Sequence, residues 1–177
     1  MIFQAEQAEK VAVLTTAQAM CAAARTAPKA KGVDHLLTAI VTDDDLCALA
    51  DEMDRLADAW GQAFFHRDAG NIRKSGAVVL IGYKNAARAL NECCQFCGFA
   101  DCKDCVEKGG RCAYTGIDLG IAVGSACSVA AQNHIDCRVM FSAGRTAMEM
   151  GILGDKAVQV LALPLSATGK SPYFDRK

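Results

Sequence analysis

Six of the ten cysteines in this 177-residue chain lie between positions 93 and 112. The run contains the spacing Cys-x2-Cys-x4-Cys, and two further cysteines follow. Two cysteines separated by two residues can direct both sulfurs at one centre. Gly98, next to the second of them, lets the backbone curl and leaves N–H groups free to face sulfur. A short loop with this many thiols predicts a site for a soft metal centre.

The spacing of the cysteines in the sequence limits which of them can be ligands and which kind of metal centre they can bind. Structural zinc sites usually place roughly a dozen residues or more between two cysteine pairs. The spacer that follows Cys97 is far shorter, so we expect an iron–sulfur cluster, with zinc and a set of free or disulfide-bonded thiols as alternatives. Cys93 is adjacent to a ligand and should point elsewhere. The expected ligands are Cys94, Cys97, Cys102 and either Cys112 or Cys105.

Length and charge set the general class. A chain of 177 residues can form one domain with a full hydrophobic core, so we expect a single domain over 1–177. The net charge of −1 gives no electrostatic reason to bind nucleic acid or an anionic membrane. We expect no signal peptide at the N-terminus, and an apolar stretch over Ile117–Ala131 too short to span a bilayer. A cytoplasmic protein is predicted, in which many cysteines indicate metal or redox chemistry.

Hydrophobic patterning predicts alternating helices and strands. The continuous apolar run Ala77–Tyr83 indicates a central strand buried on both faces. Gly61–Ser75 shows no regular pattern. The expected helices are Glu6–Ala27, a helix capped by Asp43–Asp45 and running to Trp60, a short helix from Asn85, Asp118–Asn133 and Ala143–Met150. The other expected strands are Val33–Thr42, Ile135–Phe141 and Val158–Leu165. This order predicts an α+β layered fold: a mixed sheet of about four strands flanked by helices, with the cysteine-rich segment 93–112 inserted.

Two further patterns concern binding. Glycine inside a helix lowers helix stability by about 1 kcal/mol relative to alanine. Glycines that recur on one helix face therefore indicate the close approach of another helix, a dimer mate or a flat cofactor. Such a stripe recurs every four residues at Gly116, Gly120, Gly124 and Ser128. Arg25, Lys29 and Lys31 surround a small loop that could hold a phosphate, although the pattern favours a simple solvated loop. The pattern shows no carboxylate or nucleophile partner for His66 or His134.

The cysteine spacing and several other motifs resemble one uncharacterised bacterial and archaeal family, described as containing a ferredoxin domain. The similarity extends over Cys94-x2-Cys97-Gly98-Phe99-x2-Cys102, Cys112, Ile117–Ala126, Asp136-x-Arg138-Val139-Met140 and the ending from Pro164 to Arg176. The family pattern has a cysteine just ahead of its Asp-Leu-Gly-Ile-Ala segment, which favours Cys112 over Cys105. The resemblance implies one [4Fe–4S] cluster on Cys94, Cys97, Cys102 and Cys112.

A second resemblance is to the flavin-dependent nitroreductase fold. It rests on Ala23–Pro28 with the following Asp43-Asp44, and on Met150–Val158. It implies a homodimer with FMN at the subunit interface and, in this chain, Arg25, Lys29 and Lys31 near the flavin phosphate. The arginine-rich phosphate segment of that fold is missing, and Gly32 stands where an asparagine is expected.

Together these features predict an iron–sulfur electron-transfer protein or, if FMN binds, a flavin-linked oxidoreductase. Its partner would be a redox protein or a small-molecule electron acceptor. The alternatives are a zinc-stapled binding protein and a thiol redox sensor that uses Cys93 or Cys105.

Overall fold

The computed structural model describes residues 2–174, so Asp175 and Arg176 of the C-terminal motif lie outside the described residues. Two 3-10 turns are present, η1 (Ala30–Gly32) and η2 (Asn91–Cys93). The helices are α1 (Ala5–Thr26), α2 (Asp44–Trp60), α3 (Phe64–Ile72), α4 (Cys102–Glu107), α5 (Ala113–Gln132) and α6 (Phe141–Glu149). The strands are β1 (Leu36–Val41), β2 (Ala77–Lys84), β3 (Asp136–Cys137) and β4 (Ala157–Ser166).

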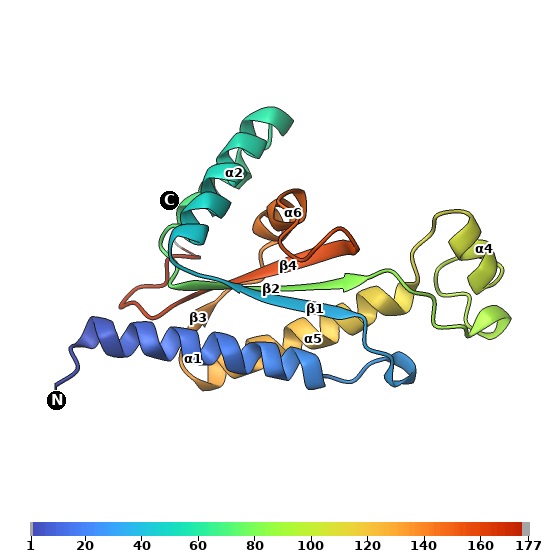
Figure 1. Cartoon of the computed structure of the whole chain (residues 1–177), viewed down its shortest axis with the longest axis horizontal. Coiled ribbons are helices and arrows are strands. Elements are labelled where there is room, and N and C mark those ends of the chain that lie inside the picture. The colour runs from blue at the N-terminus through green and yellow to red at the C-terminus, as the bar shows by residue number, and fades with distance from the viewer. Residues whose placement is uncertain (1, 175–177) are drawn as a thin grey trace.

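The four strands form one sheet in the order β1-β2-β4-β3 (Figure 1). Four strands flanked by helices were expected, and this α+β architecture is confirmed. Every pairing is antiparallel, so the expectation of a mixed sheet is wrong in that respect. The apolar run over β2 does form a central strand, since every residue from Ala77 to Tyr83 is buried.

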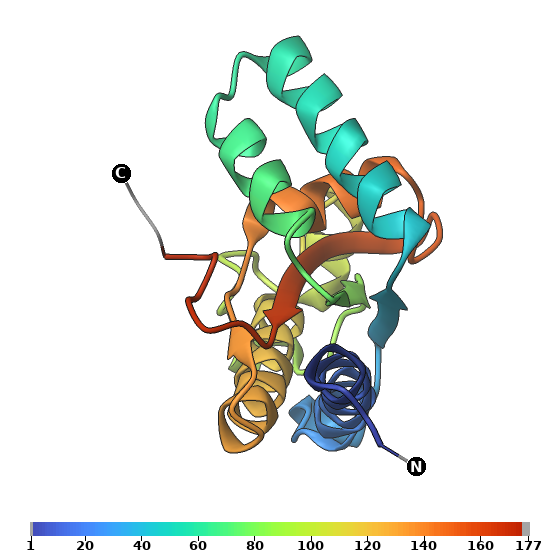
Figure 2. The same cartoon turned by 90° about the vertical axis from the view of Figure 1, so that its left-hand side faces the viewer.

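Helices cover both faces of the sheet (Figures 1 and 2). Alternate side chains of a strand point to opposite faces. Val79 and Ile81 of β2 therefore join a core with α1 and α5, whereas Val78 and Leu80 join a second core with α2, α3 and α6. The two cores fix the positions of the long helices relative to the sheet.

Several local expectations require correction. Gly61–Ser75 contains helix α3, whose buried Phe65, Ala69 and Ile72 recur at helical spacing. The short helix expected from Asn85 is absent, and Ala89 there has a positive φ of 51°, which a right-handed helix excludes. The strand expected over Ile135–Phe141 shrinks to β3 and one bridge from Met140 to Ala162.

The helix predicted from Asp118 begins earlier, at Ala113, and its 20 residues make α5 long and apolar enough to cross a membrane by length and composition alone. The expectation that this stretch is too short to span is therefore not supported by the length of the helix. In the fold, α5 packs against α1 and the sheet, where Leu119 and Ala126 are buried. Its apolar character is accounted for in part by that core.

The glycine stripe of α5 lies on the opposite, exposed side. Apart from adjacent residues and the nearby backbone of α5 itself, no atom of the described residues lies within 4 Å of where a Cβ would be at Gly116, Gly120 or Gly124. Packing against another helix of the same chain is therefore not the reason for the stripe. A dimer mate or another ligand stays a prediction.

Candidate metal centre

Residues 85–112 connect the end of β2 to the start of α5, include the cysteine-rich segment 93–112 and extend beyond one end of the sheet (Figure 1). Between these elements the chain forms only η2 and the short helix α4. Asn85 holds the two ends of this connection together. Its side-chain amide donates to the Gly110 carbonyl at 3.0 Å, and its side-chain oxygen accepts from the Cys112 N–H at 3.3 Å.

One small, partly enclosed pocket in this region is lined by all four cysteines that the family resemblance implies. These are Cys94, Cys97, Cys102 and Cys112. The pocket lining also includes the apolar or aromatic side chains of Leu90, Phe99 and Tyr114 and the charged side chain of Arg88. Among residues 2–174, no three histidine, cysteine or acidic side chains have the spacing that holds a single metal ion. The four cysteines share one pocket without the close spacing of a single-ion site.

The remaining two cysteines of the segment lie outside this lining. Cys93 is exposed, and its thiol donates to the Leu90 carbonyl at 2.8 Å, so it points away from its neighbour Cys94. Cys105 is buried. Burial raises the pKa of the Cys105 thiol, and a hydrogen bond with the Cys97 thiol and the electrostatic effect of Cys97, Cys112 and Cys102 raise it further. Cys105 is thus close to three of the four lining cysteines, and its role as an alternative fourth ligand stays a prediction.

The backbone curls through this region as the glycine suggested. Gly98 has a φ of 79°, and Asn91 and Gln95 also have positive φ values. The Asn91 N–H donates to Sγ of Cys102 at 3.3 Å. Helix α4 then begins after Asp101, whose side chain accepts from the Asp104 N–H at 2.7 Å. These contacts hold Cys102 in place and supply one N–H donor to its sulfur.

A buried ion pair lies beside the pocket and was not predicted. Arg88 Nη2 donates to Asp118 Oδ2 at 2.5 Å, and both side chains are at most 4% exposed. The other carboxylate oxygen of Asp118 accepts from the Ala30 N–H at 3.0 Å. Arg88 Nε is buried without a partner among the described residues. A charged residue within an apolar helix was the available signal, because such a charge requires a partner.

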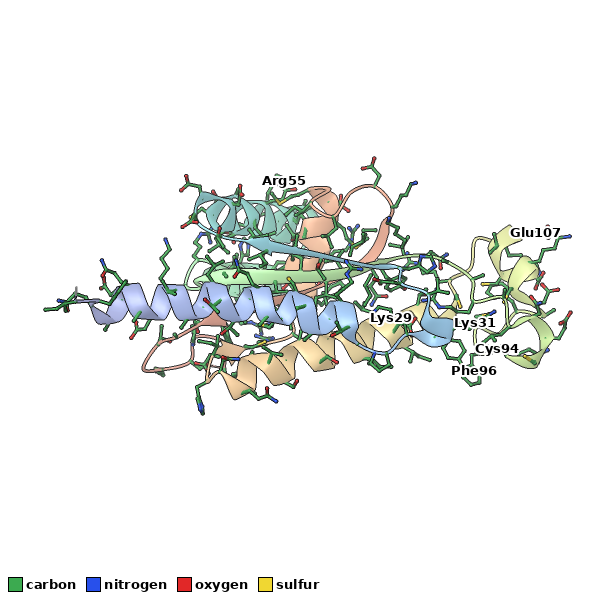
Figure 3. The ribbon with its side chains drawn as sticks, turned by 60° about the horizontal axis from the view of Figure 1, so that its bottom comes forward. Lys29, Lys31, Arg55, Cys94, Phe96 and Glu107 are labelled. Atoms are coloured by element: carbon green, nitrogen blue, oxygen red, sulfur yellow. The ribbon has the colours of Figure 1, made fainter. Side chains whose placement is uncertain are left out.

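Asp118 thus connects the cysteine pocket to the basic loop at η1, and Figure 3 shows Lys29 and Lys31 at the same end of the molecule as Cys94. Two of the three basic side chains expected near a phosphate already have hydrogen-bond or ion-pair partners within the chain. Arg25 pairs with Asp34 and donates to the Leu36 carbonyl, and Lys29 donates to carbonyls at the end of α1. The side chain of Lys31 is exposed and makes no hydrogen bond or ion pair within residues 2–174.

No histidine of the described residues lines the pocket. His66 does have carboxylate partners, contrary to the pattern-based expectation. Its Nδ1 lies 2.6 Å from Asp54 and its Nε2 lies 3.0 Å from Asp58. These partners come from α2, so only the packing of α3 against α2 brings them to His66.

Solved structures with the same fold are nitroreductases and related flavoproteins. The nitroreductase CinD from Lactococcus lactis, in complex with chloramphenicol, has a TM-score of 0.62 and 15% identity, covering 89% of this chain and 79% of that one. A BluB-like flavoprotein from Clostridium difficile 630 has a TM-score of 0.56 and 16% identity, covering 88% and 82%. This protein therefore has the nitroreductase fold, extended by a cysteine-lined loop.

Comparison of sequences identifies the family more specifically than comparison of folds. Residues 108–176 match a family described as uncharacterized proteins containing a ferredoxin domain, and this range includes Cys112. An uncharacterized protein of Archaeoglobus fulgidus is 39% identical over 184 residues, covering 99% of this chain and 98% of the relative. The chain belongs to this ferredoxin-domain family.

Proposed function

We propose that this protein is an iron–sulfur redox protein of the cytoplasm that holds one [4Fe–4S] cluster on Cys94, Cys97, Cys102 and Cys112. One observation carries the proposal: these four cysteines line a single small pocket. Family membership and the nitroreductase fold support a redox role in general.

The residues around the pocket suit such a cluster. Thiolates are the usual ligands of iron–sulfur clusters, whose potentials depend on net charge, hydrogen bonds to sulfur and exposure to solvent. Here the Asn91 N–H donates to the Cys102 sulfur, while Phe99 and Leu90 limit access of water. A bound cluster would supply one-electron transfer at a potential set by these groups.

Electrons would be exchanged at the exposed end of the loop. Phe96 and Val106 are 66% and 60% exposed there, and Phe96 stacks on Tyr114 at 5.5 Å. An apolar exposed surface beside a redox centre suits transient contact with a redox partner protein or a small-molecule electron acceptor.

A flavin link is the finer part of the proposal. Its support is the fold shared with flavoproteins and the position of the η1 loop, which contacts Asp118 beside the cysteine pocket. The cations fit a flavin phosphate only in part, since Arg25 and Lys29 have partners within the chain and Lys31 alone of the three extends freely. Adding FMN to the purified protein tests this directly. No retained flavin fluorescence after denaturation of the washed protein would contradict the flavin link and leave the cluster unaffected.

We also propose that the chain forms a homodimer through the exposed face of α5. The open glycine stripe is continuous with Ile117 and Ile121, which are 44% and 40% exposed. Light scattering should therefore give twice the mass of one chain. Gly120→Arg should give the single-chain mass, while Gly70→Arg, at another helical glycine facing open space, should stay dimeric. A wild-type monomer at micromolar concentration would contradict this arrangement.

The experiment that tests the cluster is metal and sulfide analysis of protein purified without oxygen. We expect a broad absorbance near roughly 400 nm and about four irons per chain. A colourless protein with one zinc would instead favour the zinc-stapled binding protein. A thiol sensor based on Cys105 does not fit, because it would need a lowered pKa and burial raises it.

Adjacent cysteines provide a matched control. Cys94→Ser should lose most of its iron, whereas Cys93→Ser should keep it, because only Cys94 lines the pocket. Comparing Cys112→Ser with Cys105→Ser decides the fourth ligand. Circular dichroism of each variant separates loss of a ligand from loss of the fold, and equal iron content in Cys93→Ser and Cys94→Ser at wild-type level would overturn the assignment.

A further inference from the structure

A second pair of thiols lies far from the cysteine pocket. The sulfurs of Cys127 and Cys137 are 3.9 Å apart. Cys127 is near the end of α5 and Cys137 is on β3, the edge strand that pairs with β4. Cys127 follows Cys112, at the start of α5, by fifteen residues. A rise of 1.5 Å per helical residue separates the two sites by about 22 Å.

The two thiols are accessible as well as close. Both side chains are half-buried against the core. They line an open groove of ≈ 780 Å³ together with His134, Asp136 and Arg138. A buried structural cysteine has no such opening, whereas a thiol that reacts with a second molecule needs one.

Each thiol also changes the acidity of the other. A hydrogen bond from Cys137 lowers the pKa of Cys127 to about 7, and the same contact raises the pKa of Cys137. At neutral pH a large share of Cys127 is therefore thiolate, while Cys137 keeps its proton. Attack on a disulfide proceeds fastest for a thiol whose pKa is near the ambient pH.

We propose that Cys127 and Cys137 form a redox-active dithiol that exchanges two electrons with small-molecule disulfides entering this groove. A disulfide requires the sulfurs to approach from the present 3.9 Å to about 2.05 Å. This site is independent of the proposed cluster and goes beyond the proposed function.

The exchange balances in two steps. The Cys127 thiolate attacks one sulfur of the small disulfide, which forms a mixed disulfide and releases one small thiolate. Cys137 then loses its proton and attacks the Cys127 sulfur, which forms the internal disulfide and releases the second small thiol. The protein pair loses two electrons and the Cys137 proton. The small disulfide gains both electrons and leaves as one thiolate and one thiol, and the thiolate takes its proton from water.

Closing the pair would have a structural consequence. The disulfide would join the end of α5 covalently to the two-residue strand β3, which otherwise meets the sheet only at Asp136 and Cys137. The groove lies between these elements, so its lining would change with the oxidation state. The shape of this surface groove would therefore depend on whether Cys127 and Cys137 are reduced or joined as a disulfide.

In the test, full-length, anaerobically purified protein is equilibrated with buffers of reduced and oxidised glutathione at pH 7. Free thiols are then alkylated, and the alkylated positions are mapped by mass spectrometry. We expect alkylation at Cys127 and Cys137 to be lost together, with one midpoint and a linked peptide two hydrogen masses lighter. Cys21 on α1, a half-buried thiol without a cysteine partner, should stay alkylated throughout.

Two variants make the outcome decisive. Cys137→Ser should trap glutathione on Cys127, because the resolving thiol is gone. Cys127→Ser should leave Cys137 alkylated at every ratio. Independent loss of the two thiols, glutathione retained on wild-type Cys127, or no oxidation at any ratio would overturn the proposal. Iron content serves as a separate readout: a protein without iron would contradict the proposed cluster but not the dithiol.

Discussion

The guanidinium of Arg88 and the carboxylate of Asp118 form an ion pair in the interior, at 2.5 Å, between the cysteine pocket and the loop at η1. The two residues are 30 positions apart in sequence. The pair fixes the start of α5, which follows Cys112, against the segment that precedes the other cysteines. The geometry of the pocket therefore depends on a contact that contains no cysteine.

Removing one partner of this pair should be costly. Asp118→Ala leaves the Arg88 charge buried and unpaired, and we expect the free energy of unfolding to fall by about 3–5 kcal/mol. Denaturation by urea measures the change, with cluster-free protein used for all variants. Asp51→Ala removes a partner of the more exposed Arg73 and should change stability by about 0–1 kcal/mol. Equal losses in the two variants would contradict the role assigned to the buried pair.

Gly144 is a site of close approach between α6 and β4. A Cβ at this position would lie 2.2 Å from the Val160 carbonyl oxygen, which belongs to the backbone and cannot rotate away. Gly144→Ala should therefore destabilise the fold by about 1–3 kcal/mol. Gly70→Ala, in open space on α3, should instead be neutral or stabilising by up to about 1 kcal/mol. Thermal unfolding of both variants measures the difference in stability. Equal stability of the two variants would show that α6 shifts to accommodate the added methyl group.

His66 should make stability depend on pH. Its hydrogen bonds to Asp54 and Asp58 raise its pKa, because both ring nitrogens face carboxylates and the protonated form satisfies both. The histidine's contribution is fully present below its unfolded pKa of about 6.5 and is lost as pH rises through the higher folded value. Stability should fall over that window in wild type but not in His66→Gln. NMR titration of the imidazole measures the shift, and a pKa at or below the unfolded value would refute it.

The C-terminal segment should be held by Tyr173. Its hydroxyl lies 3.0 Å from Ser75 Oγ in the interior, and burial raises the pKa of Tyr173 to about 12. Tyr173→Phe should cost about 1 kcal/mol, since Ser75 keeps its bond to the Asn71 carbonyl. Phe174→Ala, at a side chain 62% exposed, is the control and should have little effect. Urea denaturation compares them, and equal stability of Tyr173→Phe and wild type would show the hydrogen bond to be dispensable.

Features carried by adjacent residues could be predicted from the sequence. The unbroken apolar run Ala77–Tyr83 indicated a strand buried on both faces, and it is the central strand β2. The cysteine spacing indicated one site, and the four cysteines implied by the family resemblance line one pocket. In both cases the property follows from local order along the chain.

The tertiary structure decided whatever depends on segments that meet only in the fold. It set the antiparallel direction of every strand pair and placed Asp54 and Asp58 of α2 beside His66 of α3. It also brought Arg88 to Asp118 and Cys127 to Cys137. The sequence by itself determined which side chains must be buried or could bind a metal. Which of them touch was decided only when the two faces of the sheet were covered, because burying both cores fixes the helices in one relative position.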